Sequence, residues 1–382
     1  MLLIGFAWET HSMKQVVYKT HPDGDLHELY VPKGGFWKHA SLPPLNVGPP
    51  GVDLVAGYEW PKGGTKQVVY TAVYPISGDD RYTHIHELWS GGSGAWQSAD
   101  LNFLASGPPQ YRYSTGSGYA WDAGGTKQVV YATPNGHIHE LYVPVGGDWW
   151  WADLTLLSGA PALPVYSWGF SFYHVVGYDW PEGGTKQVVY AGEKGHIHEL
   201  YVAKGGSWQH ADLIQLSGAP ECKPSHICGF AWKAGGMKQV IYVSDSHIHE
   251  LSVGKGGSWM HADLTALTNS PVVSNFPISA YSWDAGETKQ VVYIGDGHIH
   301  ELYVVKGGSW KHADLTALTG APEPFVDLGA LSAYAWNTGG TKQVVYGDSN
   351  GHIHELYIAK GGSWQHVDLT DLTHSPPMFF SR

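Results

Sequence analysis

Short apolar runs separated by glycine-containing turns recur along the whole chain. Residues 117–121 are SGYAW, residues 127–132 are KQVVYA and residues 137–143 are HIHELYV. A fourth run, WQHADL at residues 208–213, has relatives at the same place in the other copies. The runs are rich in Val, Ile, Tyr and Trp and show no helical periodicity, which is typical of β-strands. The pattern therefore predicts repeated groups of four short strands.

The four-strand group occurs seven times. Each copy has a Lys-Gln pair followed by Val, then Val or Ile, then Tyr, and successive pairs are 51 (Lys238 to Lys289) to 61 (Lys66 to Lys127) residues apart. A Trp precedes each pair, and a His-Glu-Leu core and a second Trp follow it. Four antiparallel strands in a repeat of this length are the signature of a β-propeller blade. We therefore predict an all-β, seven-bladed β-propeller.

We expect a single domain of seven repeat units. The units span about residues 1–50, 51–109, 110–163, 164–222, 223–272, 273–323 and 324–382. The tail after Leu369 and the segment before Trp8 together match the linker between units six and seven, so unit seven should join unit one without an exchanged strand. We expect Phe379 and Phe380 to pack beside unit one.

Composition and charge argue against several classes of protein. Of the 382 residues, 43% are hydrophobic and 15% are charged, which indicates a folded chain with a sizeable core. The formal charge of -12 leads us to expect no nucleic-acid partner and no membrane insertion. The first residues, MLLIGFAWET, contain no basic leader and too short an apolar run for a signal peptide or a membrane span. The protein could therefore be cytoplasmic or be released without a classical signal. The spacing of Cys222 and Cys228 fits either a small disulfide loop or two reduced thiols.

The alternation of side chains along HIHELYV separates its polar residues onto two faces. The two histidines and the leucine share one face, while the isoleucine, Glu140 and Tyr142 share the other. Both faces of a blade pack on neighbouring blades, so a buried glutamate must find a partner. A hairpin turn centred on Pro134-Asn135 would place Gln128 roughly opposite Glu140 as that partner. Because a structural motif would recur in every copy, we expect most of the repeated polar residues to be structural.

Sugar binding is the first of three functional hypotheses. Indole and phenol rings stack on the C–H face of a pyranose, and Glu, Gln, His and Lys side chains hydrogen-bond to hydroxyls. The chain has 18 Trp and 23 Tyr, which supplies such rings in every unit. If each blade junction formed one pocket, several weak sites could bind the same multivalent ligand and raise the overall affinity.

Metal binding and catalysis are the other two hypotheses. His-x-His places two imidazoles on one strand face, and a third could come from the His after the second Trp, which is His210, His261, His312 or His366. Three imidazoles suit zinc, although the same residues could be hydrogen-bonded core histidines. Catalysis needs an asymmetric set of groups, whereas this chain repeats one set and contains no nucleophile elbow, phosphate loop or metalloprotease helix. We therefore predict no enzymatic activity, no cofactor and no bound metal.

The four strand motifs together resemble those of the fungal-type fucose-specific lectin superfamily of propellers. The similarity is closest to bacterial repeats with QHVVYRGTDGHIHELYW, W.HNDLT and GAP, which compare with KQVVYAGEKGHIHELYV, WQHADL and GAP in unit four. The resemblance covers nearly the whole chain. It implies sugar pockets between adjacent blades, each formed by a Glu of the third strand, a basic residue of the second strand and aromatic residues of a neighbouring blade.

The resemblance transfers these roles to recurring positions of this chain. The glutamates would be Glu140, Glu199, Glu250, Glu301 and Glu355. The family's arginine aligns with Gln128, Gln187, Gln239, Gln290 and Gln343, each preceded by a Lys. The aromatic residues would be Trp149, Trp208, Trp259, Trp310 and Trp364 with Tyr142, Tyr201, Tyr303 and Tyr357. Ser98 in unit two and Trp151 in unit three replace the His that follows the second Trp elsewhere, so we expect the most regular sites in units four to seven.

We therefore expect a multivalent carbohydrate-binding protein whose partners are glycans or glycoconjugates. The alternative is a propeller that acts as an interaction scaffold and whose repeated residues are purely structural.

Overall fold

The computed structural model of the protein describes residues 3–21, 24–44, 52–73, 82–92, 94–111, 114–164, 173–222, 226–325 and 330–378. The described strands form seven sheets, each built on four antiparallel strands in chain order that come from one predicted repeat unit. The fold is therefore the predicted seven-bladed β-propeller, with blades 1 to 7 numbered in chain order. Two compact groups of blades, residues 1–46 with 263–382 and residues 47–262, are described in turn. That the chain forms a single domain stays a prediction.

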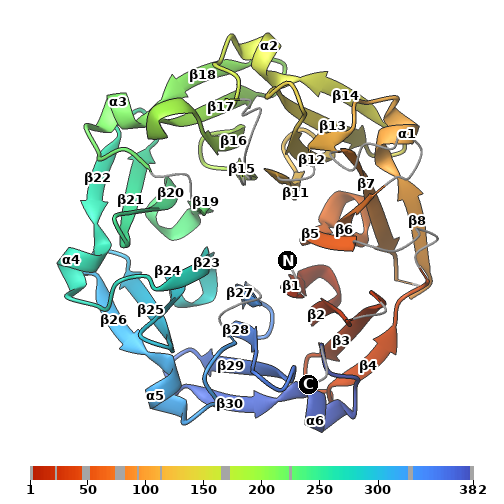
Figure 1. Ribbon diagram of the computed structural model, residues 1–382, viewed down its shortest axis with the longest axis vertical. Helices are drawn as coiled ribbons and strands as arrows, with labels where there is room; N and C mark the ends of the chain where they lie inside the picture. The colour runs from red at the N-terminus through yellow and green to blue at the C-terminus, as the bar shows by residue number, and fades with distance from the viewer. Residues whose placement is uncertain are drawn as a thin grey trace. The chain divides into compact units, whose positions relative to one another are not determined.

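The first group contains blades 6, 7 and 1. Blade 6 comprises β23 (Asn275–Trp283), β24 (Thr288–Gly295), β25 (His298–Val305) and β26 (Lys311–Asp314). Blade 7 comprises β27 (Leu331–Trp336), β28 (Thr341–Gly347), β29 (Ile353–Ala359) and β30 (Gln365–Asp368). Blade 1 comprises β1 (Leu3–Trp8), β2 (Met13–Lys19), β3 (Leu26–Pro32) and β4 (Lys38–Ser41). β1 and β23 both lie beside β27, so blades 7 and 1 are neighbours although they come from opposite ends of the chain (Figure 1). The described strands of blades 7 and 1 each form a four-stranded sheet of their own unit, which confirms the join without an exchanged strand.

The last described residue of the chain belongs to the core between blades 7 and 1. Met378 is buried in one cluster with Leu3, Val16 and Val345. Its backbone also pairs with both blades, because the amide of His21 donates to the Met378 carbonyl and the Met378 amide donates to the carbonyl of Gly351. Phe379 and Phe380, which we expected to pack beside unit one, lie outside the described residues.

The second group contains blades 2 to 5. Blade 2 comprises β5 (Val52–Trp60), β6 (Thr65–Val73), β7 (Tyr82–Ser90) and β8 (Trp96–Asp100). Blade 3 comprises β11 (Ser117–Trp121), β12 (Thr126–Ala132), β13 (Ile138–Pro144) and β14 (Trp150–Asp153). Blade 4 comprises β15 (Tyr173–Trp180), β16 (Thr185–Ala191), β17 (Ile197–Ala203) and β18 (Gln209–Asp212), and blade 5 comprises β19 (Ile227–Trp232), β20 (Met237–Ser244), β21 (His247–Gly254) and β22 (Met260–Asp263). Neighbouring blades meet along their first strands, β5 with β11, β11 with β15 and β15 with β19. Two extra pairs extend the group, because β9 (Gln110–Tyr111) pairs with β7 and β10 (Ser114–Thr115) pairs with β15.

The second strand of each blade supplies residues to two cores, which explains its continuous apolar run. In β12, Val129 and Tyr131 pack in the cluster shared with blade 2, whereas Val130 packs in the cluster shared with blade 4. All three are fully buried. Because both faces of the strand are covered, alternation between polar and apolar residues is lost there.

Two glycines allow the first strands of neighbouring blades to come close. A Cβ added at Gly177 would lie 2.2 Å from the ring of Tyr119, and one at Gly118 would lie 2.5 Å from the ring of Tyr58. Each tyrosine belongs to the preceding blade and covers the glycine of the next blade. The absence of a side chain therefore lets an aromatic ring pack directly on the neighbouring backbone.

The register of the middle hairpin corrects the predicted pairing of Gln128 with Glu140. Gln128 stands opposite Tyr142, and Glu140 stands opposite Val130. Because the hairpin is centred on Asn135, the residue opposite Gln128 is two positions further along the third strand than Glu140. Directly opposed residues share a face, so Gln128, Glu140 and Tyr142 still point to the same side of blade 3.

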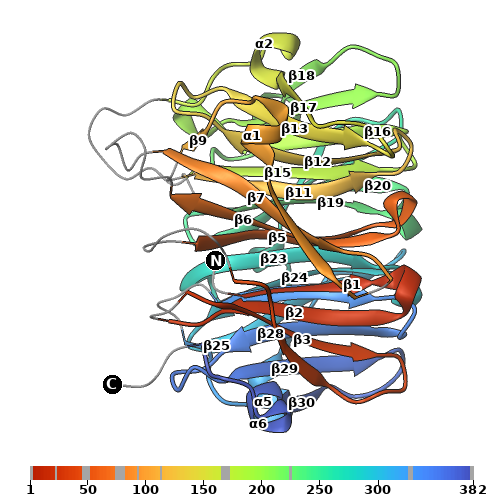
Figure 2. The ribbon, with the colours of Figure 1, turned by 90° about the vertical axis from the view of Figure 1, so that its right-hand side faces the viewer.

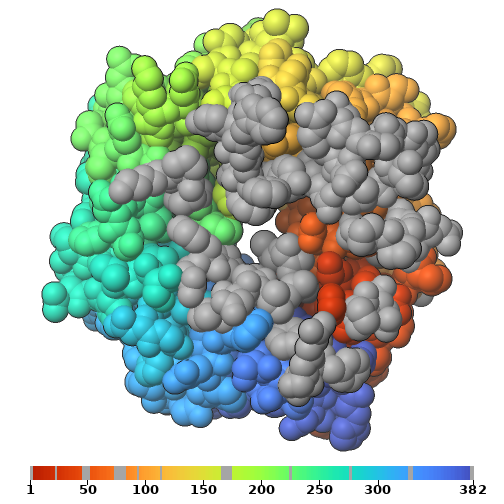
Figure 3. Space-filling model, viewed as in Figure 1, coloured from red at the N-terminus to blue at the C-terminus, as the bar shows by residue number. Residues whose placement is uncertain are grey.

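Six fourth strands continue into short α-helices, which the sequence analysis did not predict. These are α1 (Leu101–Ala105), α2 (Leu154–Ser158), α3 (Leu213–Ser217), α4 (Leu264–Thr268), α5 (Leu315–Thr319) and α6 (Leu369–Thr373). In each, an Asp at the strand end caps the helix; the Asp153 carboxylate accepts a hydrogen bond from the Leu156 amide at 2.9 Å. Helices of five residues are too short to show a periodic pattern. Each helix exposes a large apolar side chain, for example Leu156 in α2. The side view shows α6 next to β30 (Figure 2), and the blue atoms of the last part of the chain are seen at the surface in the space-filling view (Figure 3).

Two further observations concern the described residues as a whole. None of the helices in the described ranges has both the length and the apolar character needed to cross a membrane. Cys222 is buried, whereas Cys228 is partly exposed.

Candidate functional site at the blade junctions

A buried Lys–Glu ion pair links neighbouring blades at five junctions. The lysine comes from the second strand of one blade, and the glutamate comes from the third strand of the preceding blade. The shortest Nζ–Oε distances are 2.6 Å for Lys127–Glu87, 2.6 Å for Lys186–Glu140, 2.7 Å for Lys238–Glu199, 2.5 Å for Lys342–Glu301 and 2.5 Å for Lys14–Glu355. No side chain in these pairs is more than 7% exposed. The glutamate therefore finds its partner in the next blade and not within its own hairpin.

The alternation of the strand explains why lysine, and not the adjacent glutamine, takes this role. Lys127 points toward blade 2, whereas Gln128 points toward blade 4, because consecutive residues of a strand face opposite ways. The Gln128 amide nitrogen donates to the hydroxyl of Thr126, and the same contact recurs at Gln187, Gln290 and Gln343. Within the described residues, the Gln128 side-chain oxygen is buried without a hydrogen-bond donor. Gln128 thus lies on the wall of the junction but does not bond to Glu140.

Three aromatic rings surround each junction lysine. For Lys186, the ammonium nitrogen lies 5.0 Å from the ring centroid of Trp121, 5.7 Å from that of Tyr142 and 5.2 Å from that of Trp208. The first two rings belong to blade 3 and the third to blade 4. These distances are within the range of cation–π attraction.

The same three-ring arrangement occurs at the other four described junctions. The rings are Trp180, Tyr201 and Trp259 around Lys238; Trp283, Tyr303 and Trp364 around Lys342; Trp336, Tyr357 and Trp37 around Lys14; and Trp60, Trp89 and Trp149 around Lys127. At these five junctions the structure thus brings together a glutamate, a third-strand aromatic residue and a second Trp, as the sequence suggested. Sequence reasoning missed the first-strand Trp, although its recurrence before every Lys-Gln pair was a visible signal.

For Glu250, Gln239 and Trp310 the predicted role in binding stays a prediction. Within the first group, Lys289 lies 5.2 Å from the ring centroid of Trp310, both in blade 6.

Burial and charge act against each other at these pairs. Burial raises the pKa of Glu140, and the neighbouring Lys186 ammonium opposes that rise. The pKa of Glu199 and that of Glu301 are raised for the same reason. Burial lowers the pKa of Lys127, and Glu87 opposes this change. Each charge is therefore tolerated in the low-dielectric junction because its partner is present.

The first-strand residues add unmatched hydrogen-bonding groups to the junctions. The indole N–H groups of Trp60, Trp121, Trp180, Trp283 and Trp336 are buried and have no acceptor among the described residues. The hydroxyl of Tyr58 lies 3.5 Å from a carboxylate oxygen of Glu87 and donates to it. Buried donors without an acceptor are costly, so these indole groups are candidates to meet an oxygen of a ligand.

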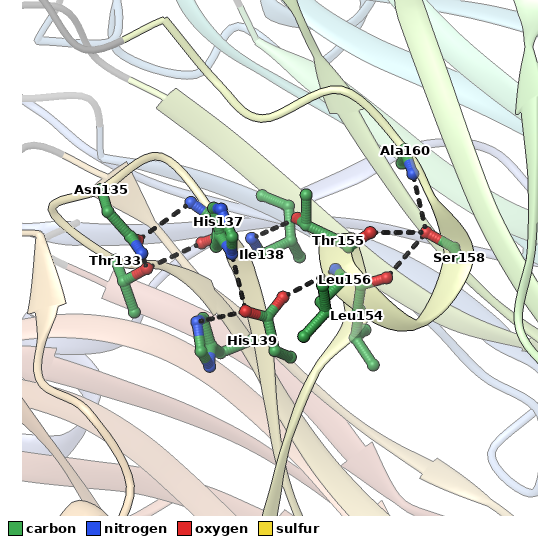
Figure 4. A network of polar contacts seen from close by, with 11 residues as sticks. Thr133, Asn135, His137, Ile138, His139, Leu154, Thr155, Leu156, Ser158 and Ala160 are labelled. Carbon is green, nitrogen blue, oxygen red and sulfur yellow. Dashed lines mark hydrogen bonds and ion pairs between the residues drawn. The ribbon is translucent and has the colours of Figure 1, made fainter.

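The histidines form a separate hydrogen-bonded network on the other side of the third strand. The first His of His-x-His bonds to the Asp at the end of the fourth strand; His137 Nδ1 lies 2.6 Å from Asp153 Oδ2 (Figure 4). The second His bonds to the His after the outer Trp, at 3.0 Å for His198–His210. Burial lowers the pKa of His198 to about 4. These contacts hold the third and fourth strands together and give the repeated histidines a structural role.

Two groups of the described residues also have the geometry to hold a metal ion. The possible ligand atoms of His137, His139 and Asp153 lie within 4.8 Å of one another, and so do those of His352, Asp368 and Asp371. The first group adds one carboxylate to two histidines and the second adds two carboxylates to one histidine, and the sequence analysis considered none of these carboxylates. The same Asp residues cap helices α2 and α6, so the hydrogen bonds alone account for their positions. Metal binding stays a hypothesis.

Comparison with known proteins gives matches to solved structures only. No protein-family model matches the sequence, and no curated protein matches it. The BP39L lectin from Burkholderia pseudomallei matches with a TM-score of 0.65 at 16% identity, over 95% of this chain and 96% of that chain. The fucose-specific lectin from Aleuria aurantia matches with a TM-score of 0.54 at 18% identity, over 83% and 94%. AofleA from Arthrobotrys oligospora matches with a TM-score of 0.53 at 16% identity, over 82% and 85%.

The chain has the fold of these lectin propellers. The resemblance predicted from the strand motifs is thus confirmed for the fold. The Aleuria lectin is a six-bladed β-propeller. Because it has one blade fewer, its match should leave part of this seven-bladed chain uncovered, and the match indeed covers 83% of this chain.

Proposed function

We propose that this lectin-fold propeller is a multivalent carbohydrate-binding protein with sugar sites at its blade junctions. The observation that carries the proposal is the set of rings around each Lys–Glu pair, because two of the three rings are only partly buried. At the junction of blades 4 and 5 these two rings are Tyr201 and Trp259. Partly exposed rings of opposite blades can stack on the C–H face of a pyranose. Lys238 and Glu199, which these rings surround, carry the donors and acceptors that can bond to its hydroxyls.

The charge of the site favours neutral sugars. Lys238 and Glu199 neutralise each other, so the junction offers no net charge to an acidic or a basic sugar. The formal charge of the whole chain is -12, which repels acidic sugars further. Fucose, which the Aleuria lectin binds according to its name, is a neutral sugar, and this supports the same ligand class for the present chain.

Repetition of the site is the basis for multivalency and for the absence of catalysis in the proposal. The described junctions repeat one arrangement five times, so a glycan surface can engage several sites at once and gain affinity without new contacts. Catalysis would require an asymmetric set of acid, base or nucleophile at one place. We therefore propose binding without enzymatic activity.

A glycan array tests the proposal when wild type is compared with a variant lacking the third-strand rings. The variant carries Tyr142→Ser, Tyr201→Ser, Tyr303→Ser and Tyr357→Ser, because blade 5 already has Ser252 at the equivalent position of its third strand. We expect wild type to bind neutral glycans and the variant to lose at least tenfold in affinity, with an unchanged circular dichroism spectrum. The matched control replaces two exposed helix residues, Leu267→Ser and Leu318→Ser, and should bind like wild type.

The interaction scaffold is the second candidate, and the deep burial of the ion pairs favours it. Side chains that are no more than 7% exposed can serve the packing of blades without any ligand. A wild-type protein that binds no glycan on the array would contradict the lectin proposal and leave the scaffold as the better account.

A further inference from the structure

An exposed tryptophan distinguishes one junction from the others. Trp150 is 58% exposed and is the first residue of β14, the outermost strand of blade 3. It stands directly opposite Tyr142 of β13. Directly opposed residues of an antiparallel pair share a face and have Cβ atoms about 4.5–5.5 Å apart, so the indole lies beside the phenol ring.

The face that these two residues share is the one that meets blade 4. Tyr142 is one of the three rings around Lys186 of blade 4, and Glu140 on the same face binds that lysine. Ala152, two residues after Trp150, packs in the core between blades 3 and 4 together with Trp208. Trp150 therefore extends the aromatic wall of this junction outward, from the Lys186–Glu140 pair to the solvent.

The equivalent position in the other blades is not aromatic. It is occupied by Lys38, Gln97, Gln209, Met260, Lys311 and Gln365 in blades 1, 2, 4, 5, 6 and 7. In blade 7 the Tyr357 hydroxyl donates to the Gln365 side-chain oxygen at 2.5 Å, so a polar pair ends the aromatic surface. An indole has no acceptor for such a bond and leaves a continuous aromatic surface instead.

We propose that Trp150 and Tyr142 form an extended subsite at the junction of blades 3 and 4 that binds the second sugar of a β-linked oligosaccharide. The inference rests on the proposed function, because the first sugar is held at the Lys186–Glu140 pair. A flat indole matches a pyranose whose substituents are all equatorial, since such a ring presents axial C–H bonds on its face. β-1,4-linked glucose and N-acetylglucosamine chains have this property in every ring. The junction of blades 3 and 4 thus prefers disaccharides and longer chains, whereas the junctions bordered by Gln or Lys bind single terminal sugars.

Titration calorimetry with cellobiose and with N,N'-diacetylchitobiose tests the subsite, with methyl β-glucoside and N-acetylglucosamine as the matched monosaccharides. We expect wild type to bind one of the disaccharides at one site at least tenfold more tightly than the matched monosaccharide. Trp150→Gln, which gives blade 3 the residue found in blades 2, 4 and 7, should remove this preference. Gln209→Trp should create a second disaccharide site beside Tyr201.

Trp151→Gln is the control, because its side chain is similarly exposed at 43% but points the other way. Trp151 stands opposite Leu141 and its ring lies 5.5 Å from that of His139, on the face toward blade 2. This variant should keep the disaccharide preference. If wild type binds array glycans but favours neither disaccharide, or if Trp150→Gln and Trp151→Gln behave alike, the extended subsite is wrong and the proposed function stands. If wild type binds no sugar at all, both fail.

Discussion

Replacement of Lys186 by methionine tests how much the junction of blades 3 and 4 depends on its buried ion pair. The lysine nitrogen lies 2.6 Å from Glu140, and the two side chains are 7% and 2% exposed. Methionine has a similar volume but leaves the Glu140 carboxylate buried without a cation. Removal of one partner of a buried ion pair costs about 3–5 kcal/mol. We expect Lys186→Met to lower the free energy of unfolding at pH 7 by this amount.

The loss should depend on pH because the orphaned carboxyl group can take up a proton. Burial already raises the pKa of Glu140, and Lys186 opposes that rise. In the variant the folded-state pKa moves further above the unfolded value of about 4.3. The folded state then binds this proton more tightly than the unfolded state does. Relative to wild type, the variant is therefore least impaired below about pH 4.3 and loses stability as the pH rises through the folded-state pKa.

Urea unfolding of four proteins at pH 7 and at pH 4.5 measures these effects. Wild type, Lys186→Met, Glu140→Gln and the double variant form a double-mutant cycle. The double variant should recover most of the loss, because it leaves no charge buried, and the coupling energy should be at least about 2 kcal/mol. A single lysine variant within about 1 kcal/mol of wild type at both pH values, as surface pairs show, would refute the account of a desolvated junction.

Three further predictions concern the blades themselves. The pKa of His198 is lowered to about 4 by burial, below the unfolded value of about 6.5, so the unfolded state takes up more protons between these values. The melting temperature should therefore fall as the pH drops from 7 to 4, less steeply in His198→Gln, and a flat profile would contradict the buried neutral histidine. Asp212→Ala should cost about 1–2 kcal/mol in thermal unfolding because Asp212 caps α3 and binds His196 at 2.5 Å, whereas Asp212→Asn, which keeps the cap, should cost less. Gly177→Val should cost about 1–3 kcal/mol by overpacking against Tyr119; an unchanged melting temperature would show that the ring moves aside.

The strands and the number of blades could be predicted because the repeat presents each strand motif seven times. Turn residues and β-branched runs mark strands of this length even in one copy, and repetition removes the remaining ambiguity. The helices α1 to α6 could not be found by periodicity, since five residues make little more than one turn. The Asp-Leu pair at the end of each of these fourth strands was nevertheless a usable signal, because Asp is a preferred N-cap residue.

The partner of Glu140 could not be predicted from a single hairpin. Side-chain alternation correctly placed Glu140 opposite in direction to His139, and it equally implied that Lys127 and Gln128 face different blades. The missing information was which blade supplies the partner, and this depends on contacts between residues 46 positions apart, Lys186 and Glu140. A stronger inference was available from chemistry, because two charged residues of opposite sign that are buried in every unit must neutralise each other somewhere.

The ion pairs make blades 3, 4 and 7 incomplete in the same way. Each of these blades carries the lysine of one pair on one side and the glutamate of another pair on its other side, so the two sides of a blade are complementary to each other rather than to themselves. Because such a head-to-tail contact joins different sides of two successive blades, it can repeat along any number of copies. Insertion of one more such unit at any of the five described junctions would again give each lysine a glutamate. The repeat is therefore a unit that gene duplication can add at these junctions without redesign of the ion pair.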